Sequence, residues 1–308
     1  WRGVEPVMRV MIRLNTLRRD WLSWIPTVWL GVFFLIPFLV VLKISLSEAT
    51  IAMPPYLPIF EWIEGSLLEI RLDFGNYLFL IDDPLYGAAY VESVRIALTA
   101  TIITLLIGYP MAYVIATARE PRRTLLLLLV ILPFWTSFLL RVYAWIAILK
   151  TNGLLNGLLM SLGVISEPLV ILQTDVAVYI GIAYTYLPFM VLPLYASLSK
   201  LDRTLLEAAE DLGATPWISF LTVTLPLTLP GVVAGSLLVF VPAIGEFVIP
   251  ALLGGNDTLM IGKVLWNEFF ANRDWPIASA VAIMMLFVIV GPLMWLNRMN
   301  AQHEEANS

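Results

Sequence analysis

The residue types that carry most enzyme chemistry are nearly missing from this chain. Its 308 residues include no cysteine and a single histidine, His303, near the end of the sequence. This excludes disulfide frameworks, thiol catalysis, metal sites built on thiolates and serine–histidine–aspartate triads. The only Gly-Lys pair, Gly262-Lys263, is followed by Val264, and Asp257 stands where a phosphate-binding loop needs glycine. Transport, anchoring or carboxylate chemistry remain, and we expect no cofactor or metal on this chain.

One carboxylate stands out because of its neighbours. Glu246 lies between Ala243-Ile244-Gly245 and Phe247-Val248-Ile249, where an acidic group is costly unless it meets a charge or water. Aromatic faces can hold the remainder of an organic cation. We predict a substrate pathway that contains Glu246 together with Trp135, Tyr143, Trp145, Tyr184 and Tyr186. The alternatives are an interfacial position or an ion pair with Arg141 for Glu246, and membrane-interface anchoring for the aromatic residues.

Composition places these residues in a membrane protein. The chain is 60 % hydrophobic and 13 % charged, with a mean hydropathy of +0.87, far above that of a soluble domain. Runs without charged residues, each long enough to cross a bilayer, occur at Trp21–Leu42, Ile96–Ala118, Thr124–Leu140, Val176–Ser199, Leu212–Gly245 and Trp275–Asn297. The fifth run contains several prolines, so we expect a short lateral helix followed by a span from about Leu227. We therefore predict an all-α membrane protein with six transmembrane helices.

Basic residues near the span ends predict the orientation. They cluster before the first span, at Arg2, Arg9, Arg13, Arg18 and Arg19, and between the second and third, at Arg119, Arg122 and Arg123. Both segments are predicted to face the cytoplasm, which places both termini there. The loop from Lys43 to Arg95 then faces outward with eight acidic and three basic residues, a balance that attracts cations. Its prolines and the run Ile59–Ile63 suggest a small cap of short helices.

These assignments predict an order of segments along the chain. It is a cytoplasmic segment (1–20), a first transmembrane helix (21–42), a periplasmic loop (43–95), a core domain with five transmembrane helices (96–297) that contains a cytoplasmic loop (201–226), and a cytoplasmic tail (298–308).

The loop between the fourth and fifth spans has the pattern of a short amphipathic helix. Asp202 is a good N-cap, and apolar residues recur at helical spacing up to Leu212. Gly213 follows where a left-handed C-cap is wanted, and Thr215-Pro216 starts another helix. A helix of about ten residues, held between two spans, is predicted.

This loop resembles the EAA loop of ABC importer permeases. Glu207-Ala208-Ala209 is followed by Gly213 and by Val223-Thr224-Leu225-Pro226 at the spacing of that pattern, with Val223 where isoleucine is usual. Phe134–Trp145, Pro242–Gly255 and Asn272–Pro276 are similar to segments of bacterial polyamine permeases, most closely the putrescine permease subunit. The resemblance covers most of the chain.

The resemblance implies a binding-protein-dependent importer fold and a set of partners. These are a second permease subunit of similar fold, a homodimeric ATPase that holds ATP and magnesium, and a periplasmic polyamine-binding protein. It implies that Glu207, Ala208, Ala209, Gly213, Leu225 and Pro226 couple the chain to the ATPase. It also implies that putrescine, spermidine or both cross the bacterial inner membrane, without catalysis by this chain or contact with nucleic acid.

Three other classes are weighed against this one. An ion-coupled secondary transporter usually carries ionisable groups near mid-membrane, which the predicted spans lack, although sodium coupling through backbone carbonyls leaves little trace in sequence. A permease for a different small solute would have the same loop. A membrane enzyme would need histidine, cysteine or acidic clusters inside the spans.

Overall fold

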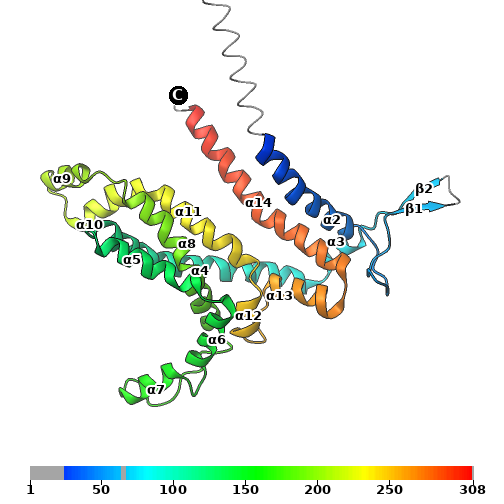
Figure 1. Ribbon diagram of the computed structural model, residues 1–308, viewed down its shortest axis with the longest axis horizontal. Coiled ribbons are helices and arrows are strands. Elements are labelled where there is room, and N and C mark those ends of the chain that lie inside the picture. Colours follow the sequence, from blue (N-terminus) through cyan, green and yellow to red (C-terminus); the bar gives the residue numbers. More distant parts are fainter. Residues whose placement is uncertain (1–23, 64–66, 307–308) are drawn as a thin grey trace, which may run out of the picture. The chain divides into compact units, whose positions relative to one another are not determined.

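A computed structural model describes residues 24–63 and 67–306, which are mostly helical (Figure 1). These residues belong to two compact units. Unit 1 contains the chain up to Leu80 and the segment Glu268–Val290, whereas unit 2 contains Ile81–Asn267 and the residues from Gly291 onward. The basic N-terminal segment that was used to predict orientation lies outside the described residues.

Unit 1 begins with the helix Trp24–Ser45, which includes a π-helical turn η1 (Gly31–Leu35) and α2 (Ile36–Ser45). Asn76 in α3 (Gly75–Asp82) secures the end of this helix, because its side-chain amide donates to the carbonyls of Ser45 (3.0 Å) and Ser47 (2.9 Å). The unit also contains most of η4 (Asn267–Asn272) and the first part of α14 (Trp275–Ala306).

The segment between the first two long helices contains a hairpin where short helices were predicted. Strand β1 (Phe60–Ile63) pairs antiparallel with β2 (Leu67–Ile70), with Phe60 opposite Ile70. Aromatic and β-branched residues in β1 favour a strand. The predicted cap of helices is therefore wrong for this segment, although α3 follows it.

Three long helices form the core of unit 2. Helices α4 (Pro84–Thr117), α8 (Asp175–Leu198) and α11 (Leu225–Ile244) pack side by side (Figure 1). They meet at Met190, which is fully buried; a Cβ added to Gly235 would lie 2.9 Å from its sulfur, and one added to Gly108 would lie 2.9 Å from its Cγ. Small residues of this kind let membrane helices approach closely.

Shorter elements surround this core and position the candidate site. In chain order they are α5 (Arg122–Ile131), η2 (Leu132–Trp135), α6 (Phe138–Leu149), α7 (Leu154–Ser161), α9 (Arg203–Asp211), α10 (Pro216–Ser219), η3 (Phe220–Thr224), α12 (Val248–Leu252) and α13 (Ile261–Trp266). Helix α9 lies at the end of unit 2 beside α10, where α8 ends and α11 begins (Figure 1).

Among the described residues, five helical stretches are long and apolar enough to cross a membrane. They are Trp24–Ser45, Pro84–Thr117, Phe138–Ser161, Asp175–Leu198 and Pro216–Ile244. The predicted sixth span corresponds to a shorter apolar stretch, Trp275–Gly291, within α14. The described chain thus supports a helical membrane protein with five such candidate spans.

Two span boundaries differ from the prediction. The run Thr124–Leu140 is not one helix, because Pro133 follows the end of α5 and the chain is extended at Thr136 before α6 begins. Proline lacks the amide donor and blocks continuation of the preceding helix. The fifth run behaves in the opposite way: Pro216–Ile244 is continuous, and a π-helical segment, η3, stands where a break was expected.

Candidate functional site

A cavity of about 540 Å³ opens among four elements of unit 2. Its walls come from η2, α6, α8 and the junction between α11 and α12. The lining residues are Phe134, Phe138, Arg141, Thr185, Tyr186, Phe189, Pro242, Gly245, Glu246, Phe247 and Val248. The cavity therefore combines aromatic rings with one acidic and one basic side chain.

Glu246 is placed in this cavity by a break between two helices. Helix α11 ends at Ile244 and α12 begins at Val248, so Glu246 lies in the short connection. The amides of Val248 (3.0 Å) and Ile249 (3.4 Å) donate to its Oε1, and the Tyr186 hydroxyl donates to its Oε2 at 2.7 Å. These donors compensate for burial of a carboxylate that is only 8 % exposed.

Arg141 faces the same cavity from the first turn of α6. Its guanidinium carbon lies 5.3 Å from the ring centre of Phe134 and 5.9 Å from that of Phe138, a cation–π arrangement. Its Nε and Nη1 atoms are shielded from solvent and have no hydrogen-bond partner among the described residues. For a partly buried arginine, two nitrogens that are shielded from water without a hydrogen-bond partner are unfavourable.

The other predicted pathway residues do not all meet here. Tyr186 lines the cavity with Glu246, whereas Tyr184 lines a separate, apolar cavity of about 580 Å³ between α4, α5 and α8. Trp145 packs edge-on against Tyr184, with 5.4 Å between ring centres. Trp135 is 81 % exposed and Tyr143 is 55 % exposed. The structure therefore brings two of the six predicted residues together in the charged cavity.

Several lining residues were not proposed for the pathway from sequence. Phe134, Phe138, Thr185 and Phe189 line the cavity, and Phe134 packs edge-on against Phe189, with 5.0 Å between ring centres. The usable signals were the spacing of Phe138 and Arg141, which places both on one face of a helix, and the same relation between Thr185 and Phe189. The break that brings Phe134 to this wall had its signal in Pro133, which the search for charge-free runs did not use.

The predicted cytoplasmic helix is present as α9. The Asp202 side chain accepts from the Thr204 amide at 3.0 Å as its N-cap, and Gly213 has a φ of +82° directly after the last turn. Glu207 and Ala208 are exposed, and Leu212 is 90 % exposed. An amphipathic helix with this much exposed surface is available to a partner.

The remaining residues that were predicted to couple the chain to an ATPase lie at the start of α11. Leu225 packs partly buried against the core of unit 2, and Pro226 is exposed in the first turn of the helix. Helix α9 contacts η3, which leads directly into α11, the long helix that ends beside Glu246.

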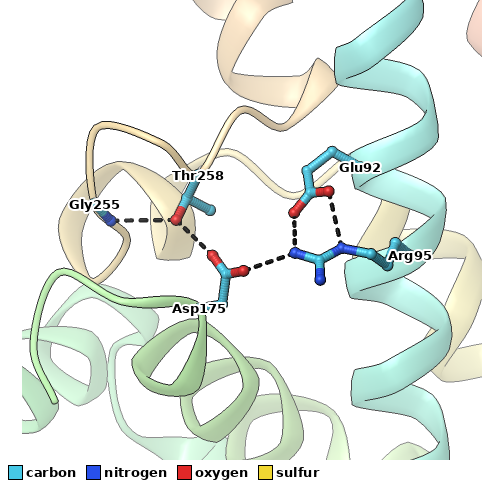
Figure 2. Close-up of polar contacts among 5 residues, drawn as sticks. All are labelled: Glu92, Arg95, Asp175, Gly255 and Thr258. Carbon is cyan, nitrogen blue, oxygen red and sulfur yellow. Dashed lines mark hydrogen bonds and ion pairs between the residues drawn. The ribbon is translucent and has the colours of Figure 1, made fainter.

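A second charged cluster connects the N-terminal end of α8, at Asp175, to neighbouring elements (Figure 2). Arg95 of α4 contacts both oxygens of Glu92 and also donates to Asp175 at 2.7 Å. Asp175 accepts from the Thr258 hydroxyl at 2.8 Å, and the Gly255 amide donates to that hydroxyl at 3.3 Å. These contacts connect α4, α8 and the loop before α13.

Residues 104–299 match the family described as the binding-protein-dependent transport system inner membrane component. This chain belongs to that family. It is thus a transporter permease component rather than an enzyme subunit, and a protein of the inner membrane.

Curated relatives confirm the narrower resemblance. The chain is 43 % identical over 278 residues to the spermidine/putrescine transport system permease protein PotB of Haemophilus influenzae, covering 88 % of this chain and 92 % of the relative. It is 41 % identical over 261 residues to PotB of Escherichia coli, covering 85 % and 90 % respectively.

Solved structures support the fold. A bacterial ABC transporter that imports the acidic polysaccharide alginate gives a TM-score of 0.65 at 19 % identity, covering 94 % of this chain and 98 % of its own. A bacterial alginate ABC transporter in complex with an alginate pentasaccharide-bound periplasmic protein gives 0.64 at 18 % identity, covering 94 % and 96 %.

Proposed function

We propose that this chain is the permease subunit of a polyamine importer that moves putrescine, spermidine or both across the bacterial inner membrane. The observation that carries the proposal is the buried Glu246 carboxylate, bonded to Tyr186 in a cavity with aromatic walls. The names of the PotB relatives support the same substrates.

The cavity suits a flexible organic cation. An ammonium head binds the Glu246 carboxylate, because a low-polarity wall strengthens the attraction between opposite charges. The methylenes then lie against the rings of Phe134, Phe138 and Phe189, and those rings also attract the positive charge. The Tyr186 hydroxyl and the two amides orient the carboxylate and remain in place while the cation comes and goes.

ATP hydrolysis on a partner ATPase dimer drives the cycle through α9. The exposed face around Glu207 and Leu212 docks on the ATPase, and its movement passes through the Gly213 turn and α10 to α11. The inward-open and outward-open states pre-exist, and the nucleotide shifts their populations by binding one more tightly than the other.

The proposed assembly has a second permease subunit of similar fold and a periplasmic polyamine-binding protein. The solved transporter in complex with a periplasmic protein supports such docking. In this arrangement α14 crosses the membrane as a sixth helix, so both termini are cytoplasmic, and the hairpin β1–β2 lies on the periplasmic side. Purification in mild detergent followed by mass spectrometry should recover the ATPase and the second permease. An ion-coupled carrier would purify without an ATPase.

A second candidate substrate class is favoured by one observation. The unpaired Arg141 guanidinium in the cavity is suited to an anion, since guanidinium groups recognise carboxylates and phosphates. Uptake of radiolabelled putrescine, compared with uptake of a small dicarboxylate by the same cells, separates the two classes.

The substitution that tests the function is Glu246→Gln, which keeps the side-chain size and removes the charge. Putrescine uptake by cells that depend on this chain should fall at least about tenfold, because a hydrogen-bonded charge pair is lost. The exposed Glu167 provides a matched control, and Glu167→Gln should leave uptake unchanged. Equal uptake by Glu246→Gln and wild type would contradict the cation role of Glu246.

A further inference from the structure

We propose that Arg141 is the mobile internal counter-ion of Glu246: its guanidinium, which pairs with no described carboxylate in this structure, binds Glu246 in the states of the cycle that release substrate, and an incoming ammonium group displaces it. This inference rests on the proposed function, in which cations bind Glu246. It assigns Arg141 a specificity-determining role, since a bound cation must compete with a charge that the chain itself supplies.

The first support is the condition of the guanidinium. Nε and Nη1 of Arg141 are out of contact with solvent, yet neither donates a hydrogen bond within the part of the chain that the structure describes. The rings of Phe134 and Phe138 attract its charge without accepting its N–H groups in the way that an oxygen does. A guanidinium in this state is stabilised by a charge-assisted hydrogen bond to any carboxylate that comes within reach.

The second support is the identity of the groups that share its cavity. Among the eleven lining residues, Glu246 is the only one with a carboxylate and Arg141 is the only one with a basic side chain. The walls between them are aromatic, aliphatic or hydroxyl-bearing. Opposite charges that share a cavity with largely apolar walls attract each other more strongly than they do in bulk water.

The third support is the spare hydrogen-bonding capacity of Glu246. Within the described residues, its Oε1 accepts from two backbone amides, whereas Oε2 accepts from the Tyr186 hydroxyl alone. A carboxylate oxygen has two lone-pair sites, so Oε2 can accept a further donor while all three existing hydrogen bonds stay in place. An arginine N–H or a substrate ammonium suits this position, and they compete for it.

This competition has a consequence for transport. A carboxylate with no counter-ion would hold a multivalent cation tightly, and a pathway must also release what it binds. Arg141 supplies a charge that takes the carboxylate back as the ammonium leaves. The same charge opposes binding of a second ammonium head beside it, so the cavity takes one head of a polyamine while the other extends away from α6.

A double-mutant cycle in the complete transport system tests the pairing. Arg141→Gln and Glu246→Gln should each lower putrescine uptake about tenfold. The double variant should take up as much putrescine as the less active of the two single variants, because both substitutions remove the same interaction. Lys150, exposed after the end of α6, gives the control Lys150→Gln, which should match wild type.

The outcomes of the cycle separate the two proposals. Losses that multiply to about a hundredfold in the double variant would overturn the pairing and leave the cation role of Glu246 standing. Wild-type uptake by Glu246→Gln would overturn that role, and the pairing with it. Wild-type uptake by Arg141→Gln would overturn the pairing alone.

Chemical restoration of the charge gives a second, independent measurement. The chain has no cysteine, so Arg141→Cys introduces the one thiol of this subunit. A 2-aminoethyl methanethiosulfonate forms a mixed disulfide with that thiol, releases methanesulfinate and restores a positive charge. Uptake should recover at least about threefold when Glu246 is present and not in the Glu246→Gln background.

The anionic 2-sulfonatoethyl reagent is the matched comparison, and it should not restore uptake. Wild-type complexes treated with either reagent show any effect on other subunits. Equal recovery with both reagents, or recovery that persists in Glu246→Gln, would mean that only side-chain volume at this position matters and would overturn the inference.

Discussion

Two arginines in unit 2 differ in whether a carboxylate pairs with them. Arg95 is about half exposed and contacts two carboxylates, Glu92 and Asp175, which belong to α4 and α8. Arg141 is more enclosed, and none of the described carboxylates pairs with it. The group with better access to water is the one that the chain has neutralised.

The difference separates charges that hold helices together from charges kept for a solute. The Arg95 cluster extends to Thr258 and Gly255, so its charges are satisfied within the chain (Figure 2). Arg141 and Glu246 each face a cavity with capacity left over, a condition typical of functional rather than structural charges inside membranes. Substitutions in the first cluster should change stability, and those in the cavity should change transport.

The largest loss of uptake is expected at Gly213, which contacts neither arginine. The losses expected for the Arg141 and Arg95 variants can be compared with it. Gly213→Val should lower uptake by about a hundredfold, because a β-branched residue is strained at a φ of +82° and the turn after α9 must change shape. Gly163 offers a matched control: it has a φ of +68° and, like Gly213, no atom within 4 Å of an added Cβ.

Gly163→Val carries the same backbone penalty of about 1–2 kcal/mol and should retain uptake. Substrate-stimulated ATPase activity and uptake, measured together in proteoliposomes, distinguish lost coupling from lost protein. Equal losses in the two variants would mean that destabilisation, not coupling, is responsible.

Arg141→Met should lower putrescine uptake about tenfold while the melting temperature stays within about 2 °C of wild type or rises, since replacing an unpaired charge by an apolar side chain removes a desolvation penalty. Uptake and thermal unfolding of the same detergent-purified preparations give both values. A fall in melting temperature as large as that of Arg95→Met would erase the distinction between the two arginines.

Arg95→Met should show the reverse pattern. Loss of the Asp175 contact should cost about 0.5–1 kcal/mol of stability, because the pair is partly exposed and solvent weakens it. Uptake per folded molecule should remain within about twofold of wild type. Asp175→Asn supplies the other side of this pair, and thermal unfolding of both single variants and the double variant measures their coupling.

Much of the membrane architecture could be predicted from sequence because lipid imposes simple rules on length and hydropathy. Helix α9 was predicted closely, since Asp202, Gly213 and Thr215-Pro216 mark its ends by local chemistry alone. The break at Pro133 was missed because charge-free runs do not reveal where an apolar helix stops.

The candidate site was only partly predictable. Glu246 was recognisable as a carboxylate among apolar residues, but its contact with Tyr186 joins residues 60 positions apart. Phe189 and Thr185 enter the same wall only because α8 packs against α11. Likewise, the hairpin β1–β2 was missed because prolines in the preceding segment suggested short helices, whereas the strands are held by pairing between β1 and β2.

That hairpin supplies the smallest expected effect and a third arginine for comparison. Arg71 donates to both carboxylate oxygens of Glu69 (2.8 and 3.1 Å), and this hydrogen bonding lowers the pKa of Glu69 below its usual value. A carboxylate whose pKa is lowered in the folded state stabilises the fold while it is ionised. This stabilisation is lost as the pH falls through the range in which the carboxyl group is protonated. Glu69→Gln should therefore differ from wild type, if at all, only near neutral pH.

Because the Glu69–Arg71 pair is partly exposed to solvent, we expect the melting temperatures of Glu69→Gln and wild type to agree at pH 7 and at acidic pH, and uptake to be unchanged. Thermal unfolding across this pH range checks the prediction. A loss at neutral pH comparable with that of Arg95→Met would show that the hairpin depends on this pair. Arg71, which is 56 % exposed and pairs with Glu69, would then stabilise the chain as much as Arg95, which is 53 % exposed and pairs with two carboxylates.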